Sequence, residues 1–110
     1  MSLNTNRYTY RITWSEDDRE FIGLCIEFRS LSWLAKTPGG ALNGIRRAVK
    51  KAVQDMEKNG EVPPIPISGK LYSGKFVVRI PPEVHRALSI KAAEEGVSLN
   101  RLVSARLTSP

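Results

Sequence analysis

Residues 75–107 read KFVVRIPPEVHRALSIKAAEEGVSLNRLVSARL, and this stretch decides the fold of the second half of the chain. It begins with one alternating strand over residues 75–80, passes two prolines, and continues as two short amphipathic helices separated by Gly96. A single strand beside two helices leaves its own edges unpaired and cannot enclose a core. We therefore predict that a second copy of the chain pairs with it, strand to strand, across a two-fold axis.

The alternation along the predicted strand gives its two faces different chemistry. One face is apolar and is predicted to form the dimer core together with two residues of the second helix; these residues are Phe76, Val78, Ile80, Leu102 and Val103. The other face carries Lys75, Val77 and Arg79. A two-stranded ribbon with such an outer face fits the DNA major groove, where arginine can read guanine and Val77 offers only a contact to a thymine methyl group.

Helix signals flank this strand. Pro82 and Glu83 suit the first turn of a helix, Gly96 is a typical stop, and Ser98 is a good N-cap for the next helix. The amide groups of Leu99 and Asn100 would then be free at a helix start, which is an anion site suited to a DNA phosphate. The residues predicted to face inward are Val84, Ala87, Leu88, Lys91, Ala92, Leu99, Leu102, Val103 and Leu107.

The first half of the chain predicts a three-strand meander followed by a helix, so the fold class is α+β. Strands are expected over residues 8–14, 21–28 and 31–36, with a polar turn at 15–20. In the second strand Ile22, Leu24, Ile26 and Phe28 are expected on one face, and in the third Trp33 and Ala35 are expected to face inward. Thr37 and Pro38 begin the helix, and Asn59-Gly60 ends it. Its apolar stripe is Ala41, Leu42, Ile45, Ala48, Val49, Ala52, Val53 and Met56, and basic residues lie mainly opposite.

These elements divide the chain into three parts. Residues 1–66 form the first domain and end in a proline-rich extended exit. Residues 67–74 are a linker that could hold a short fourth strand, which gives the pattern β-β-β-α(-β). Residues 75–110 form the second domain.

Composition narrows the classes of partner. The net charge is +6, with +3 on residues 1–74 and +3 on residues 75–110, which favours nucleic acid or another polyanion. Cys25 is the sole cysteine and lies in an apolar run, so we expect a buried thiol and a reducing cytoplasmic setting. No run of about 20 apolar residues is present, so no membrane span is expected.

The sequence predicts neither catalysis nor a bound cofactor. The acidic residues Glu16, Asp17 and Asp18 are adjacent in a turn, so their side chains diverge rather than converge on a metal ion. His85 is the sole histidine and has no second metal ligand near it in the sequence.

The segments Phe76-Val77-Val78-Arg79-Ile80-Pro81 and Gly96-Val97-Ser98-Leu99-Asn100 resemble the MetJ/Arc-type ribbon-helix-helix family. That resemblance implies an intertwined dimer. It also implies base reading by Lys75, Val77 and Arg79 and a phosphate clamp at Ser98, Leu99 and Asn100.

The first domain resembles the HicB antitoxin domain, a reduced ribonuclease-H-like fold, on the segment from Glu27 to Leu42. A HicB-like domain followed by a ribbon-helix-helix tail implies an antitoxin that neutralises a HicA-type mRNA-cleaving toxin. It also implies repression of its own operon through operator DNA, as a homodimer that could pair into a tetramer. Two alternatives stay open: a freestanding ribbon-helix-helix regulator, and a dimeric interaction module that does not bind DNA.

Overall fold

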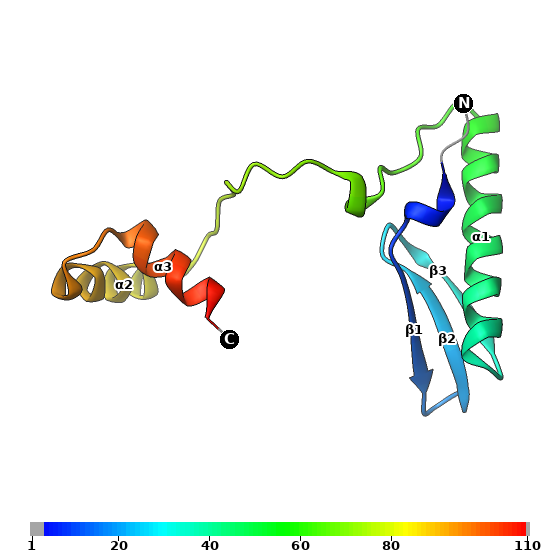
Figure 1. Ribbon diagram of the computed structural model, residues 1–110, viewed down its shortest axis with the longest axis horizontal. Helices are drawn as coiled ribbons and strands as arrows, with labels where there is room; N and C mark the ends of the chain where they lie inside the picture. The colour runs from blue at the N-terminus through cyan, green and yellow to red at the C-terminus, as the bar shows by residue number, and fades with distance from the viewer. Residues whose placement is uncertain (1–3, 110) are drawn as a thin grey trace. The chain divides into compact units, whose positions relative to one another are not determined.

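The structure is a computed structural model that describes residues 4–109. The chain is α+β, as predicted, and divides after Tyr72 into two compact units (Figure 1).

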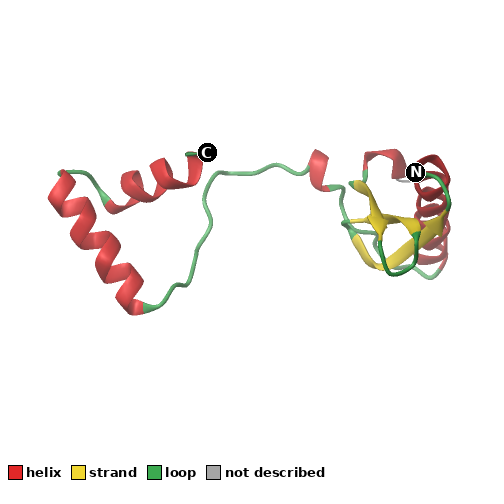
Figure 2. Ribbon diagram, turned by 90° about the horizontal axis from the view of Figure 1, so that it is seen from below, coloured by secondary structure: helices red, strands yellow, loops and turns green. Residues whose placement is uncertain are grey.

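The N-terminal unit is a three-stranded antiparallel sheet with one long helix against it. Its strands are β1 (Tyr10–Ser15), β2 (Glu20–Cys25) and β3 (Phe28–Ala35), in the order β1-β2-β3, and its helix is α1 (Pro38–Lys58). Short 3-10 turns, η1 (Thr5–Arg7) and η2 (Ile67–Gly69), lie before the sheet and after the helix. Figures 1 and 2 show α1 lying along one face of the sheet. The predicted meander and helix are confirmed.

Helix α1 supplies most of the core through its apolar stripe. Ala41, Ile45, Val49 and Val53 are buried, and Tyr8 and Cys25 join them from the sheet side. The N-terminal signals are confirmed, because the Thr37 side chain accepts a hydrogen bond from the Gly40 N–H at 3.0 Å and Pro38 occupies the first helical position. Burial raises the pKa of the Cys25 thiol to about 11, so this residue is the buried hydrophobe that the sequence predicted.

The face of β2 that packs on α1 carries Gly23 and Cys25, which are its buried residues. Ile22 and Leu24, which the sequence placed on one face, lie together on the opposite side. The pairing register shifts between Leu24 and Cys25, and the chain then turns, so Ile26 stays exposed and Phe28 reaches the core from β3. The predicted shared face therefore holds for Ile22 and Leu24 and fails for Ile26 and Phe28, because β2 ends at Cys25.

Two glycines allow α1 to approach the sheet closely. A Cβ atom on Gly23 would lie 2.4 Å from the Ala41 carbonyl oxygen, and one on Gly44 would lie 2.0 Å from Cδ1 of Trp33. Gly44 is itself buried within the helix. The smallest residues therefore occur where the helix and the sheet are in contact.

We expect Gly23→Ala to lower the free energy of unfolding of the N-terminal unit by about 1–3 kcal/mol, because backbone atoms of α1 would have to move. Gly39→Ala is the matched control. A Cβ atom at Gly39 meets nothing within 4 Å, so this change should be neutral or stabilising by up to about 1 kcal/mol. Chemical denaturation followed by circular dichroism measures both. Equal stability of the two variants would contradict the close approach at Gly23.

The linker does not contain the possible fourth strand. Residues 61–66 have no regular structure, and the turn η2 takes the place where a strand was considered. Pro66 is buried and Ile67 donates its N–H to a side chain of the N-terminal unit, so the linker is bound to that unit up to this turn.

The C-terminal unit consists of two helices, α2 (Pro82–Glu95) and α3 (Leu99–Thr108). The predicted caps are confirmed. Gly96 is left-handed at φ 70°, and the Ser98 side chain accepts from the Arg101 N–H at 3.1 Å. Among the described residues of this unit, Ala92 and Leu102 are the buried ones. Leu107 was predicted to be inward but is 69 % exposed, because nothing in a single chain covers the last turn of α3.

Candidate nucleic-acid interface

Residues 75–80 are not a strand within one chain. The prediction gave this segment a partner in a second copy, and backbone N–H and C=O groups form a strand ladder only when a neighbouring strand is present. The start of the segment is tied to Ser73 by two hydrogen bonds: the Lys75 N–H donates to the Ser73 hydroxyl at 3.1 Å, and that hydroxyl donates to the Lys75 carbonyl at 3.4 Å. It enters α2 directly through Pro81 and Pro82.

The predicted dimer core is not assembled within one chain. Phe76 is 75 % exposed and Val78 is 62 % exposed, and Ile80 is exposed as well. Leu102 is buried between the helices and Val103 is partly buried. The segment therefore presents a row of apolar side chains to solvent, which monomeric soluble proteins seldom do over a contiguous stretch.

The predicted inner side of α2 is also exposed to solvent in a single chain. Val84, Ala87, Leu88 and Lys91 line an open groove of about 480 Å³, together with Glu83 and Arg106. Val84 is 42 % exposed, so its predicted inward position is not achieved in a single chain. Ala92 alone of the predicted inner side of α2 is fully covered.

The predicted base-reading residues Lys75, Val77 and Arg79 are all exposed. The predicted clamp lies at the start of α3. The Arg101 N–H donates to the Ser98 hydroxyl, and the Leu102 N–H donates to the Ser98 carbonyl. The N–H groups of Leu99 and Asn100 have no acceptor among the described residues. The free amide pair has the geometry that anions use at helix starts. The Ser98 hydroxyl is engaged as the cap.

Sequence reasoning missed a carboxylate that holds the linker. The Glu27 carboxylate accepts from the Thr9 N–H at 2.9 Å, from the Thr9 hydroxyl at 3.1 Å and from the Ile67 N–H at 3.0 Å. Two more contacts hold the chain after α1: the Tyr8 hydroxyl donates to the Pro64 carbonyl at 2.8 Å, just before the linker, and in the linker the Ser68 hydroxyl donates to the Arg7 carbonyl at 2.7 Å. A glutamate within the apolar run of residues 21–28 was the available signal.

These contacts also set the ionisation of Glu27. Burial acts to raise the pKa of this carboxyl, but hydrogen bonds from the Ile67 and Thr9 N–H groups outweigh burial, so the pKa lies below its ordinary value. A carboxylate with a depressed pKa in the folded state contributes stability above its unfolded pKa. That contribution is lost as the pH falls through the folded pKa.

We expect Glu27→Gln to release the linker, because the amide loses the charge and one of the two acceptor oxygens. Protection of the Ile67 and Thr9 amides from hydrogen exchange should fall about tenfold. Acidification of the native chain should give the same result. Glu61→Gln is the control, since Glu61 is exposed and should leave both amides unchanged. Unaltered protection in Glu27→Gln would show that the carboxylate does not hold the linker.

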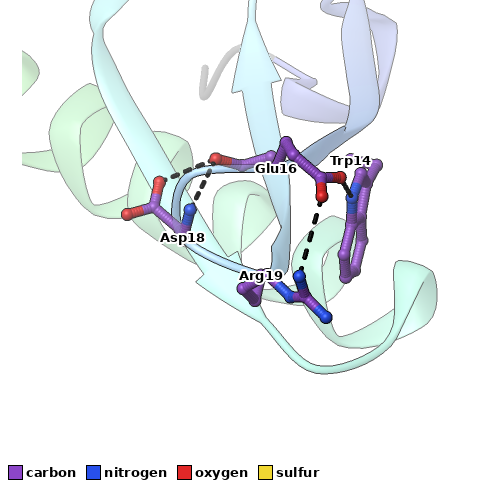
Figure 3. Close-up of polar contacts among 5 residues, drawn as sticks. Trp14, Glu16, Asp18 and Arg19 are labelled. Carbon is purple, nitrogen blue, oxygen red and sulfur yellow. Dashed lines mark hydrogen bonds and ion pairs between the residues drawn. The ribbon is translucent and has the colours of Figure 1, made fainter.

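The acidic turn between β1 and β2 uses its carboxylates locally (Figure 3). Glu16 accepts from Trp14 Nε1 at 2.8 Å and pairs with Arg19 at 3.7 Å, while Asp18 accepts from the Ser15 hydroxyl at 2.9 Å. Figure 3 shows the two carboxylates on opposite sides of the turn. Within residues 4–109, no three His, Cys, Asp or Glu side chains are grouped so that they could hold a metal ion. No helix in the described part of the chain is long and apolar enough to span a bilayer.

The structure is that of a small α+β protein whose C-terminal unit leaves the apolar side chains of residues 76–80 exposed. The model of the HicB family matches residues 53–107, half of the 110-residue chain, and the chain belongs to that family. Membership places it among the antitoxins of toxin–antitoxin pairs, whose partner is a toxin. The match covers the end of α1, the linker and the C-terminal unit, and it does not include the segment 27–42 on which the first-domain resemblance rested. No curated protein and no solved structure matches the chain.

Proposed function

We propose that the chain is a non-enzymatic antitoxin that neutralises a HicA-type mRNA-cleaving toxin and represses its own operon as a DNA-bound dimer. The observation that carries this proposal is the exposure of residues 76–80 beside two helices that bury Ala92 and Leu102 alone among the described residues. A unit with so little buried area cannot offset the entropy of ordering its own chain.

A ribbon-helix-helix arrangement resolves this exposure with a second copy. Pairing of residues 75–80 across a two-fold axis would satisfy the backbone groups of both segments and place Phe76, Val78 and Ile80 on the four helices of the dimer. The same pairing places Lys75, Val77 and Arg79 on the opposite face. The free amides of Leu99 and Asn100 then supply phosphate contacts that fix the ribbon in the groove.

The N-terminal unit offers a surface for the toxin on the sheet face opposite α1. Because Gly23 and Cys25 face the helix, their neighbours Ile22 and Leu24 face the other way, and Leu34 pairs with Ile22 on that side. Leu34 is 45 % exposed, and no described element covers this face. An apolar sheet face with polar neighbours suits a protein partner.

Co-expression with the small reading frame beside the gene tests the proposal. The native chain should relieve the growth arrest caused by that product and should shift a duplex from its own promoter in a gel assay. Arg79→Ala should keep the relief and lose most of the promoter binding, which separates the two activities. Promoter binding without relief would support a freestanding regulator, and dimerisation without either would support an interaction module; both results contradict the proposal.

A further inference from the structure

The solvent side of α1 carries a basic ridge, which we define as Arg46, Arg47, Lys50 and Lys51. All four side chains are exposed, while Ile45 and Val49 in the same turns of α1 are fully buried. The four residues occupy two successive turns of one helix, so the ridge extends about 6–8 Å along the axis. The geometry gives four cations on one face of a rigid element.

Within residues 4–109, no carboxylate forms an ion pair with the ridge. The sequence from Thr37 to Gln54 contains no Asp or Glu, and Asp55, one turn after Lys51, is the first carboxylate of the helix. The ion pairs of the described residues join Arg19 to Glu16, Lys36 to Glu20 and Lys91 to Glu95, and none involves the ridge. Like charges one turn apart on a helix repel each other, so the ridge destabilises the free chain and would be relieved by a polyanion.

Two of the cations are held in place before any ligand arrives. The Arg46 guanidinium donates to the Asn6 side-chain carbonyl, and the Arg47 guanidinium lies over the Trp33 ring, 5.6 Å from its centroid. Both arginines border a hollow of about 530 Å³ that Gly40 and Asn43 also line. Guanidinium groups fixed beside an open hollow suit phosphate oxygens, which they can bind through two parallel hydrogen bonds.

We propose that the basic ridge is a second, sequence-independent contact to the phosphate backbone of duplex DNA. This inference rests on the proposed DNA binding by the C-terminal unit, which would deliver the ridge to its ligand. The linker is bound to the N-terminal unit as far as Ile67 and Ser68, and α2 begins at Pro82. The 12 residues from 70 to 81 span at most about 40 Å. When the C-terminal unit is bound to DNA, the ridge is therefore tethered near the same duplex, and the effective concentration of phosphate groups around it is high.

The test is the salt dependence of duplex binding by the full chain. In the ridge variant, Arg46, Arg47, Lys50 and Lys51 are all replaced with glutamine. The matched control replaces Arg11, Arg29, Lys58 and Lys70 with glutamine; these four are exposed and the net charge changes equally. We measure the affinity for two duplexes, an operator with long flanks and an unrelated sequence, at salt concentrations between about 50 and 300 mM. This range brackets 0.1 M, where the electrostatic screening length is ~10 Å.

The ridge variant should reduce the slope of log affinity against log salt by about 3–4 per chain, since each phosphate contact contributes about 0.9. The control should retain the native slope, and both variants should keep the operator preference. An equal decrease of the slope in the two variants would mean that net charge alone causes the effect, and this would overturn the proposal. Single-stranded RNA is measured in parallel, and a decrease of the slope seen with RNA but not with duplex DNA would also overturn it. A native chain with a ridge-dependent slope but no operator preference would instead contradict the proposed function of the C-terminal unit.

Discussion

Phe76→Ala should convert the chain from a dimer of about 25 kDa, twice the 12.3 kDa of one chain, to a monomer in sedimentation. In a single chain Phe76 is 75 % exposed, and truncation of so exposed a side chain should leave stability nearly unchanged. In the proposed dimer the same ring is buried, and truncation of a buried phenylalanine costs about 3–5 kcal/mol for each copy. The expected dissociation constant therefore rises by more than about a thousandfold.

Val77→Ala is the control for this result. Val77 follows Phe76 in the chain, is 90 % exposed and lies on the predicted outer face. Its truncation should leave the sedimentation mass of the dimer unchanged. A Phe76→Ala chain that sediments like the native protein would show that this segment does not hold two chains together.

Arg79→Ala should weaken binding to the operator by about 1–3 kcal/mol, a loss of roughly five- to 150-fold in affinity. Arg79 is exposed, and the structure gives it no carboxylate partner within residues 4–109, so its removal should not affect folding. Because a base contact carries sequence information, discrimination between operator and unrelated duplex should narrow with the affinity.

Arg86→Ala is the comparison for Arg79. Arg86 is also an exposed arginine of the C-terminal unit, but it lies on α2 and outside the predicted ribbon. Any loss of affinity in Arg86→Ala should be the same for the operator and for the scrambled duplex. Fluorescence anisotropy with labelled operator and scrambled duplexes measures both variants. Intact discrimination after Arg79→Ala would remove this residue from base reading.

Local signals in the sequence predicted the elements of the fold. The Thr37-Pro38 start of α1, the left-handed Gly96 and the Ser98 cap each depend on a few neighbouring residues, and each occurs in the structure as predicted. The polar turn at residues 15–20 was predictable for the same reason, since it joins Ser15 to Glu20 across a hairpin.

The features that the sequence did not predict depend on contacts between distant residues. The side of β2 that packs on α1 depends on contacts between the sheet and the helix, which an alternating apolar run does not specify. The role of Glu27 depends on Ile67, 40 residues away in the sequence, whose N–H donates a hydrogen bond to the Glu27 carboxylate. Residues 75–80 form no strand in a single chain, and the predicted dimer core is not assembled there, because the pairing that we propose needs a second copy.

Pairing of two copies through residues 75–80 can be observed in an isotope-filtered nuclear Overhauser experiment on a mixture of labelled and unlabelled chains. This experiment detects contacts between protons of two different copies. In the proposed dimer, residues 75–80 of one chain contact the same residues of the other, centred near Val78, and their amides are protected from exchange. Freely exchanging amides at residues 75–80, without any contact between labelled and unlabelled chains, would show that the C-terminal unit does not pair in this way.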